Sequence, residues 1–328
     1  MAAVDPNVDP VGYLGMTRNP DGSITRLPGP PPLATPASSD PSNNPFHFTK
    51  DVTINESNGN WARLFVPRET FASSPLKKLP LIIYFHGGGF VVMSVSTPLF
   101  DDFYKAIVTE LPAVVVSVEH RLAPEHRLPA AYDDCMEALY WIKNSKDEWL
   151  TKYADLSNTF LMGTSSGGNI AYNLCLRVSA CVDDLMPLQI KGLILNGPFF
   201  GGTQRTDSEL RLANDKLMPL CATDLMWELC LPVGVDRDHE YCNPTVGIKS
   251  HQFDHIKALG WKVLVTGCYG DPLSDRQIEL VKILEEHGVL VLGKFEKGGS
   301  HAHEFFDPSK AKALCIILKE FTASSSTS

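Results

Sequence analysis

Hydrophobic residues occur along most of the chain in short runs, separated by longer stretches in which apolar and polar positions are mixed. Residues 79–85 (Leu-Pro-Leu-Ile-Ile-Tyr-Phe) are nearly all apolar, as expected of a strand covered on both faces. Further buried strands are expected at 113–118, 159–162, 190–196, 261–266 and 290–295. Alternation of apolar and polar residues at 51–54 and 61–66 predicts an antiparallel pair.

Amphipathic stretches fall between these runs. Helices are expected at 99–110, 130–143, 168–180, 277–287 and 309–321. Strands that alternate with helices indicate an α/β fold, in which a mostly parallel central sheet carries helices on both faces. No internal repeat is evident, so residues 1–328 are expected to form one domain.

Two segments break this alternation. Residues 1 to about 45 are rich in Pro, Asn, Asp and Ser and include the run Pro28-Gly29-Pro30-Pro31-Pro32, which predicts an arm with little regular structure. Residues about 203–256 contain helix-like pieces at 208–217 and 222–231 but no buried strand. This insertion is consistent with a helical cap over an active site and equally with a peripheral helical excursion.

One candidate for chemistry is the turn Gly163-Thr164-Ser165-Ser166-Gly167, between a predicted strand and a predicted helix. A sharp strand-to-helix turn of this kind exposes a nucleophilic serine, and small neighbours permit the close crossing. Ser165 would also lie at a helix N-terminus, which favours negative charge. The five-residue pattern alone arises by chance in roughly one chain in ten of this length, so its setting carries the interpretation. Ser166 fits the turn less well.

A second candidate is His86-Gly87-Gly88-Gly89, at the end of the predicted strand 79–85. Consecutive glycines permit unusual φ angles and leave backbone N–H groups open to an oxyanion. A phosphate-binding loop would need a different glycine spacing, which this stretch lacks.

An acid and a histidine should follow the serine along the chain. Asp271 lies in the loop after strand 261–266 and precedes a proline, which favours an extended conformation. Ser274 and Gln277 predict a capping box, which would place Asp275 in the first turn of a helix as an ordinary dipole partner. The histidine is expected in the loop 298–303, where both His301 and His303 fit and His301 is nearer the strand end.

Taken in order, these motifs resemble the hormone-sensitive-lipase group of α/β-hydrolases. The stretch Arg121-Leu122-Ala123-Pro124-Glu125 and the Asp271-Pro272-Leu273 segment match the same group, and Gly-Asn-Ile-Ala at 168–171 is most similar to its plant carboxylesterases. The resemblance covers roughly residues 50–320 and implies an α/β-hydrolase fold with a helical cap formed by the arm and the 203–256 insertion.

The resemblance also implies roles. Ser165 is similar to the family nucleophile, Asp271 to its acid and His301 to its base, and the separation of 30 residues between the last two suits the family. The oxyanion hole would consist of the backbone N–H groups of Gly88, Gly89 and Ser166.

Two positions depart from the family pattern. Thr164 stands where Asp is usual, and we expect altered hydrogen bonding there rather than loss of activity. His303 stands where Phe is common, which keeps it open as an alternative base.

Composition narrows the setting. The chain of 328 residues is 44% hydrophobic and carries a net charge of −9, which argues against nucleic acid or an anionic membrane as a partner. Its eight cysteines lack zinc-site spacing, and residues 1–10 do not resemble a signal peptide, so a cytoplasmic protein is expected. The family leans to monomers.

The function expected is hydrolysis of small carboxylic esters through an acyl-enzyme, without metal or cofactor. A gibberellin-receptor-like hormone binder is one alternative, although those receptors lack the triad histidine. A dehydratase or transesterase acting at the same site is another.

Overall fold

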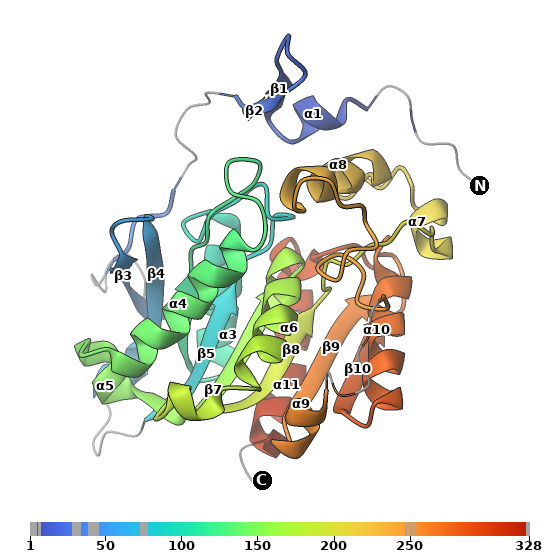
Figure 1. The fold of residues 1–328 in the computed structure, drawn as a ribbon. Coiled ribbons are helices and arrows are strands. Elements are labelled where there is room, and N and C mark those ends of the chain that lie inside the picture. The colour runs from blue at the N-terminus through green and yellow to red at the C-terminus, as the bar shows by residue number, and fades with distance from the viewer. Residues whose placement is uncertain are drawn as a thin grey trace.

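A computed structural model describes residues 5, 8–27, 34–38, 46–72, 78–246, 248, 251 and 253–325. Within them one sheet of eight strands dominates, in the order β10-β9-β8-β7-β5-β6-β4-β3 (Figure 1). The strands are β3 (His47–Asn55), β4 (Asn60–Pro67), β5 (Leu79–Phe85), β6 (Val114–Val118), β7 (Ala154–Thr164), β8 (Ile190–Asn196), β9 (Lys262–Cys268) and β10 (Leu290–Glu296).

In the order of the sheet, strands β6, β5, β7, β8, β9 and β10 run parallel to one another. Ile83 of β5, for example, lies beside Val116 of β6 on one side and Leu161 of β7 on the other. At the other edge, β4 pairs antiparallel with β6 and β3 pairs antiparallel with β4. The predicted mostly parallel sheet and the predicted antiparallel pair are both confirmed.

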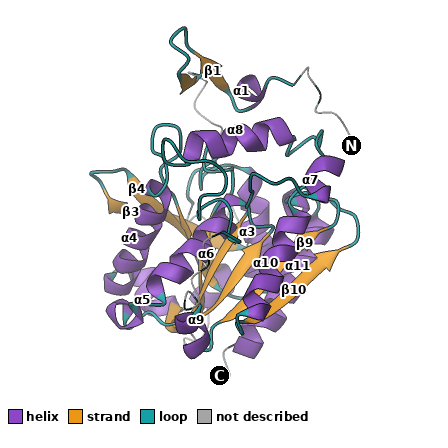
Figure 2. Ribbon diagram, turned by 45° about the vertical axis from the view of Figure 1, so that its right-hand side comes forward, coloured by secondary structure: helices purple, strands orange, loops and turns teal. Residues whose placement is uncertain are grey.

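Helices cover the sheet on both faces (Figure 2). Alternate strand residues point to opposite sides, so Ile83 and Ile82 enter two different apolar cores. Burial of each such side chain contributes about 1.5–3 kcal/mol. The first core packs against α4 (Ala130–Asn144), α6 (Ser166–Val178) and α10 (Ser274–Glu286), and the second against α3 (Leu99–Glu110) and α11 (Pro308–Ser325).

Smaller elements lie in the connections. They are α2 (Arg68–Ala72), α5 (Glu148–Tyr153), η1 (Val182–Leu185), α7 (Asp207–Arg211), α8 (Leu220–Cys230), α9 (Asp254–Ala258) and η2 (His303–Phe305). The helix expected over 208–217 is therefore confined to α7, whereas the one expected over 222–231 corresponds to α8. Strand β7 begins at Ala154, earlier than expected, because Asp155, Ser157 and Asn158 interrupt the apolar pattern on which the prediction relied.

The N-terminal arm has more regular structure than its composition predicts. It contains α1 (Pro10–Tyr13) and an antiparallel pair, β1 (Met16–Arg18) and β2 (Ile24–Arg26). The Asp9 side chain accepts hydrogen bonds from two amides of the first helical turn, a common way for such a helix to begin. The prediction of little regular structure was wrong for these residues, and the 28–32 proline run lies outside the described residues.

Apolar packing places the arm over the strand ends (Figure 1). Val11, Leu14 and Met16 are buried in the same apolar cluster as Met226 of α8. The Tyr13 hydroxyl donates to the carbonyl of Leu217 at 2.9 Å. The arm is thus attached to the insertion that follows β8.

Arg26 provides a second attachment. Its guanidinium lies 3.2 and 3.0 Å from the two carboxylate oxygens of Glu125, in a fork arrangement. It also donates to the carbonyls of Val91, at 2.8 Å, and Ala123, at 2.9 Å. One side chain therefore fastens β2 to two separate loops of the main body.

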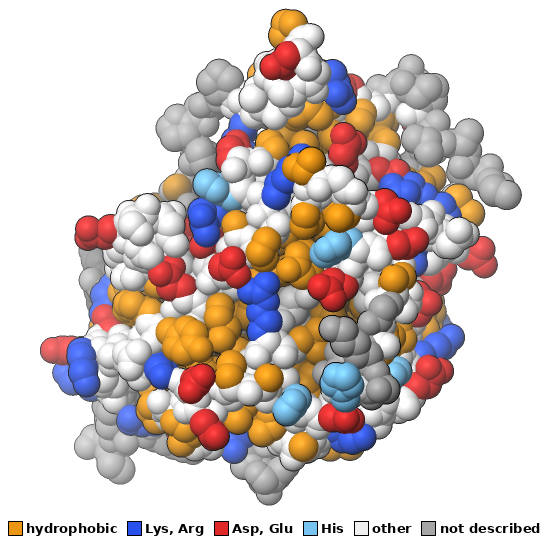
Figure 3. All heavy atoms as spheres, viewed as in Figure 1, with side chains coloured by type: hydrophobic (Ala, Val, Ile, Leu, Met, Phe, Trp, Pro, Cys, Tyr) orange, Lys and Arg blue, Asp and Glu red, His pale blue; other side chains and the backbone are white. Residues whose placement is uncertain are grey.

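Charges of both signs are interspersed with apolar side chains on the face that carries α4 and α6 (Figure 3). Of the helices in the described ranges, none combines the length and the hydropathy that crossing a bilayer requires.

We expect Arg26→Ala to loosen the arm. The exposed ion pair with Glu125 contributes little by itself, about 0–1 kcal/mol, but the bonds to two carbonyls are lost with it. Limited proteolysis should cleave the arm of this variant faster than that of the wild type. Arg26→Lys should give an intermediate rate, because an ammonium group cannot form the planar fork. Equal cleavage of all three proteins would contradict this function of Arg26.

Candidate active site

Ser165 occupies a strained turn between β7 and α6. Its φ and ψ angles are 57° and −121°, a region that non-glycine residues rarely adopt. The Ser165 amide donates to the Asn196 carbonyl at 2.9 Å, and the Ser165 carbonyl accepts from the Phe199 amide at 2.9 Å. These bonds to the last residue of β8 and to the segment after it hold the turn in its unusual conformation.

Two glycines make this turn possible. A Cβ atom on Gly163 would lie 2.0 Å from the Gly167 carbonyl oxygen. A Cβ on Gly167 would lie 1.9 Å from the Phe85 carbonyl oxygen. Both distances are far below contact, so α6 can cross the strands this closely only with glycine at both positions.

The two adjacent serines differ in their surroundings. Ser165 lines a cavity together with His301 and is 7% exposed. The hydroxyl oxygen of Ser166 is buried and has no hydrogen-bond partner within the described residues. Ser166 instead presents its backbone N–H at the start of α6.

The glycine loop after β5 lies directly against the serine turn. A Cβ on Gly87 would lie 3.2 Å from the Ser165 Cβ. Gly88 and Gly89 have φ angles of 115° and 61°, which favour glycine. In the described part of the chain, no backbone carbonyl accepts from the N–H groups of Gly88, Gly89 or Ser166. These three amides are thus suited to bind an oxyanion.

Buried polar groups support the base of this loop. The rings of His86 and His120 stack at 4.1 Å, and Glu119 lies 3.6 Å from the His86 Nε2 atom. Glu119 also accepts hydrogen bonds from Ser94 and from the Val95 amide at 2.7 and 2.8 Å. Burial lowers the pKa of His120 to about 3, so this ring is neutral.

Asp271 and His301 come together from the loops after β9 and β10. The His301 Nδ1 atom lies 2.8 Å from Asp271 Oδ2. Both residues are buried, with exposures of 3% and 1%. The carboxylate also accepts from the Leu273 amide at 2.8 Å and from the Gln277 side chain at 2.9 Å. Three donors therefore fix its orientation.

The predicted capping box at Ser274 is wrong. Helix α10 begins at Ser274 itself, after Leu273, and the Ser274 hydroxyl is buried without a partner in the described residues. Gln277 turns toward Asp271 instead. Asp275 lies in the first helical turn, as expected, and accepts from the Ser208 amide at 2.7 Å, which links α7 to α10.

The environment of His301 favours its protonated form. Burial acts most strongly and opposes the imidazolium, but the charge and hydrogen bond of Asp271, together with the charges of Glu304 and Asp215, outweigh it, and the pKa of His301 is raised above its ordinary value. A neutral imidazole held by Asp271 Oδ2 carries its proton on Nδ1, which leaves Nε2 as the acceptor.

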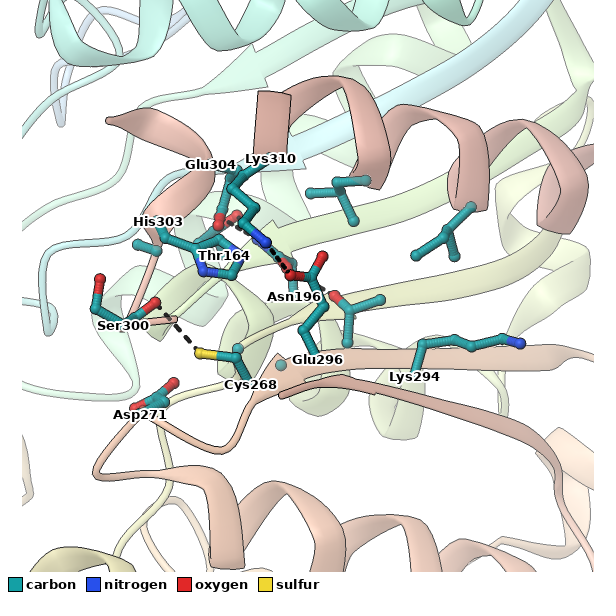
Figure 4. Close-up of a pocket in the computed structure, with 16 residues that line it drawn as sticks. Thr164, Asn196, Cys268, Asp271, Lys294, Glu296, Ser300, His303, Glu304 and Lys310 are labelled. Atoms are coloured by element: carbon teal, nitrogen blue, oxygen red, sulfur yellow. Dashed lines mark hydrogen bonds and ion pairs between the residues drawn. The ribbon is translucent and has the colours of Figure 1, made fainter. Parts of the chain in front are cut away.

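His303 has a different setting. Its Nδ1 atom is buried without a partner among the described residues, and a Cβ on Gly299 would lie 2.5 Å from that atom. His303 lines a small cavity together with Asp271, Ser300 and Glu304 (Figure 4). Of the two candidate histidines, His301 is the one that hydrogen-bonds to Asp271 and lines the cavity of Ser165.

That cavity has a volume of about 200 Å³ and mostly apolar walls. Apart from His301 and Tyr13, no described residue that lines it carries a titratable side chain. The wall includes Tyr13 and Leu14 from the arm, Met226 from α8, and Met93, Phe100 and Phe305 from the main body. It suits an uncharged, largely apolar ligand.

Several polar neighbours of the site were not expected from the sequence. Asn196 accepts the Ser165 amide through its carbonyl, Gln277 binds Asp271, and Glu304 is buried behind His301. Gln277 could have been recognised from its position six residues after Asp271, in the helix that follows. Asn196 carries no local signal, because it meets the site only through the order of strands in the sheet. Glu304 is near His301 in the sequence, but its pairing with Asn196 has no local signal.

Comparison with known proteins agrees with this geometry. Residues 82–306 match the family of proteins with the alpha/beta hydrolase fold. The chain is 50% identical to carboxylesterase 20 of Arabidopsis thaliana, over 98% of both chains. It is 49% identical to a 3-O-acetylpapaveroxine carboxylesterase of Papaver somniferum, over 83% of this chain and 89% of that protein.

Solved structures show the same architecture. A Pyrobaculum calidifontis esterase superposes with a TM-score of 0.71 at 25% identity, covering 85% of this chain and 87% of the esterase. The family match extends over most of the chain, and the match to carboxylesterase 20 spans nearly its whole length. The chain therefore belongs to the α/β-hydrolase family and, within it, to the plant carboxylesterases.

Proposed function

We propose that Ser165, His301 and Asp271 form the catalytic triad of this carboxylesterase. The observation that carries the proposal is the 2.8 Å hydrogen bond between Asp271 and His301, next to a strained serine that lines the same cavity as the histidine. The amides of Gly88, Gly89 and Ser166 form its oxyanion hole.

The reaction has two steps. Ser165 attacks the ester carbonyl while His301 Nε2 takes the hydroxyl proton, and the three amides bind the oxyanion that develops. His301 then returns this proton to the departing alcohol, which leaves an acyl-Ser165. Water attacks the acyl group with His301 again as base, and the carboxylic acid and free Ser165 are released. Asp271 stabilises the imidazolium that forms in each step.

The substrates are small, uncharged carboxylic esters. The cavity of about 200 Å³ supports this, because it is apolar and its lining offers no permanent charge to pair with an ionised ligand. One plant relative is named for an O-acetyl ester, which supports short acyl groups. The arm and the insertion at about 203–256 form the cap, since Tyr13, Leu14 and Met226 come from them.

The enzyme acts as a monomer in the cytoplasm. All eight cysteines are free, which supports a reducing compartment. The carboxylesterase relatives favour hydrolysis over the hormone-binding, dehydratase and transesterase alternatives.

Ser165→Ala should abolish turnover of p-nitrophenyl acetate. Loss of the nucleophile removes the acyl-enzyme route, and kcat should fall by about a thousandfold or more. Ser179→Ala, at the C-terminal end of α6 and outside the cavity lining, is the matched control and should stay active. Activity that survives in Ser165→Ala would refute the site assignment, and a folded wild type without turnover would refute ester hydrolysis.

His301→Ala and His303→Ala should separate the two histidines. We expect the first to lose about a thousandfold or more in kcat, because it removes the general base. The second should retain most of the activity, since His303 lies outside the substrate cavity. Steady-state kinetics on the same ester measures both, and the opposite ranking would assign the base to His303.

The pH dependence of kcat/KM should report His301. The imidazole must be neutral to accept the serine proton, so activity falls as pH is lowered through its pKa. Because the carboxylates around His301, Asp271 foremost, raise that pKa over the opposing effect of burial, the midpoint of the acid limb should lie above the ordinary value of 6.5. In Asp271→Asn, the acid limb of the residual kcat/KM should move to lower pH, because the carboxylate that raises the pKa of His301 is gone. A wild-type midpoint below 6.5 would contradict this account.

A further inference from the structure

A buried carboxyl group lies behind the triad and has no part in the reaction described above. Glu304 belongs to η2, three residues after His301, and is 6% exposed. Within the described residues it forms no ion pair with lysine or arginine. A carboxyl group buried without a cation is costly, so a specific partner must offset its loss of water.

That partner is Asn196. Its side-chain N–H group donates to a Glu304 carboxylate oxygen and, at 3.1 Å, to the Thr164 hydroxyl. Its side-chain carbonyl accepts from the Thr266 hydroxyl at 2.6 Å. Its backbone carbonyl accepts the Ser165 amide at 2.9 Å. Asn196 therefore connects the ends of β7, β8 and β9 and holds the serine turn directly.

Glu304 extends these hydrogen bonds to the loop that carries His301. It lies on the short helix that follows His301, whereas Asn196 and Thr164 lie at the strand ends (Figure 4). Through Glu304 and Asn196, the histidine loop is bonded to the residue that precedes Ser165 and to the Ser165 amide. Among the described residues, no other hydrogen-bonded pair of side chains connects η2 with the serine turn.

The hydrogen-bonded pair of Glu304 and Asn196 does not reach the substrate. Glu304 and Asn196 line a cavity of only about 40 Å³, too small for an ester. Thr164 and Ala302 form part of the walls of both this cavity and the substrate cavity, and so separate Glu304 from the ester.

Other titratable groups face the same region from each neighbouring element. They are His301 and His303 beside Glu304, Cys268 at the end of β9, Asp271 in the loop after β9, Lys294 and Glu296 on β10, Lys310 on α11 and Tyr84 on β5. Lys310 is paired with Glu296, at 2.5 Å.

We propose that Glu304 is a positioning residue for ester hydrolysis, which fixes Asn196 between the serine turn and the histidine loop. The inference rests on the assignment of Ser165 and His301 given under the proposed function. Burial raises the pKa of Glu304, and the hydrogen bond from Asn196 opposes that rise. Any negative charge on Glu304 adds to that of Asp271 in raising the pKa of His301.

Two substitutions separate the hydrogen bond from the charge. Glu304→Leu removes the acceptor and leaves the Asn196 N–H without it, so the serine turn and the histidine loop lose their link. Glu304→Gln keeps an acceptor oxygen in the same place and removes only the ability to ionise. The relative positions of the triad residues should be disturbed in Glu304→Leu and preserved in Glu304→Gln.

We expect Glu304→Leu to lower kcat on p-nitrophenyl acetate by about tenfold or more, as a small misplacement of reacting groups does, with KM nearly unchanged. Glu304→Gln should restore kcat to near the wild-type value and move the acid limb of kcat/KM to lower pH, because His301 loses a neighbouring negative charge. Both variants are compared at equal folded fraction, measured by circular dichroism.

Glu137→Gln is the matched control. Glu137 also accepts hydrogen bonds from asparagine side chains, those of Asn55, Asn58 and Asn60, but it lies on α4, away from both cavities. This variant should leave kcat and the pH profile unchanged.

A folded Glu304→Leu with the kcat and pH profile of the wild type would overturn the proposal. If Glu304→Leu does not fold, Glu304→Gln decides, since an acid limb that stays in place or a tenfold loss of kcat would each contradict the proposed role. Ser165→Ala distinguishes the two levels of inference. Activity in that variant refutes the site itself, whereas an inactive Ser165→Ala with unaffected Glu304 variants refutes only the role of Glu304.

Discussion

The close crossing of α6 over the sheet is the constraint on which the rest of the site depends. Gly163 and Gly167 leave room for one backbone to pass another where a single Cβ atom would fall within 2.0 Å of a carbonyl oxygen. Because the chain must turn within one residue, Ser165 takes a positive φ and its side chain projects from the sheet edge. The same crossing brings the first amide of α6 beside the glycine loop after β5. A nucleophile and an oxyanion-binding group thus arise from one packing requirement.

The strain in this turn is supported by its surroundings. The Ser165 amide is bonded to Asn196, the last residue of β8, and the Ser165 carbonyl to Phe199 in the segment after it. Asn196 is itself held by side chains from β7, β9 and η2. Asp271 is likewise fixed by three donors. Such preorganisation lets the groups meet a transition state without rearranging.

Much of this arrangement could be predicted from the sequence. The apolar runs fixed the positions of the buried strands, and short glycine-rich motifs marked the loops after β5, β7 and β10, because chemistry at a strand end requires small residues next to it. The hydrogen bond between Asn196 and Glu304 could not be predicted, since Asn196 reaches the site through strand order, which no local pattern encodes. Ser274 shows the opposite error. Its local pattern predicts a helix cap with Gln277, but Gln277 instead bonds to Asp271 in the folded protein. The arm was misjudged because its proline content masked the helix start at Asp9.

The origin of the substrate cavity has a consequence for how such enzymes diverge. The reacting groups lie at strand ends that the core holds in place, whereas much of the wall comes from α8 and from an arm attached mainly through Arg26 and a few apolar side chains. Residues such as Leu14 and Met226 can therefore change without disturbing the core or the chemistry. A gene duplicate could acquire a new ester through a handful of substitutions in these two peripheral segments, and plant genomes that retain many copies of one such scaffold would have a short route to many different hydrolases.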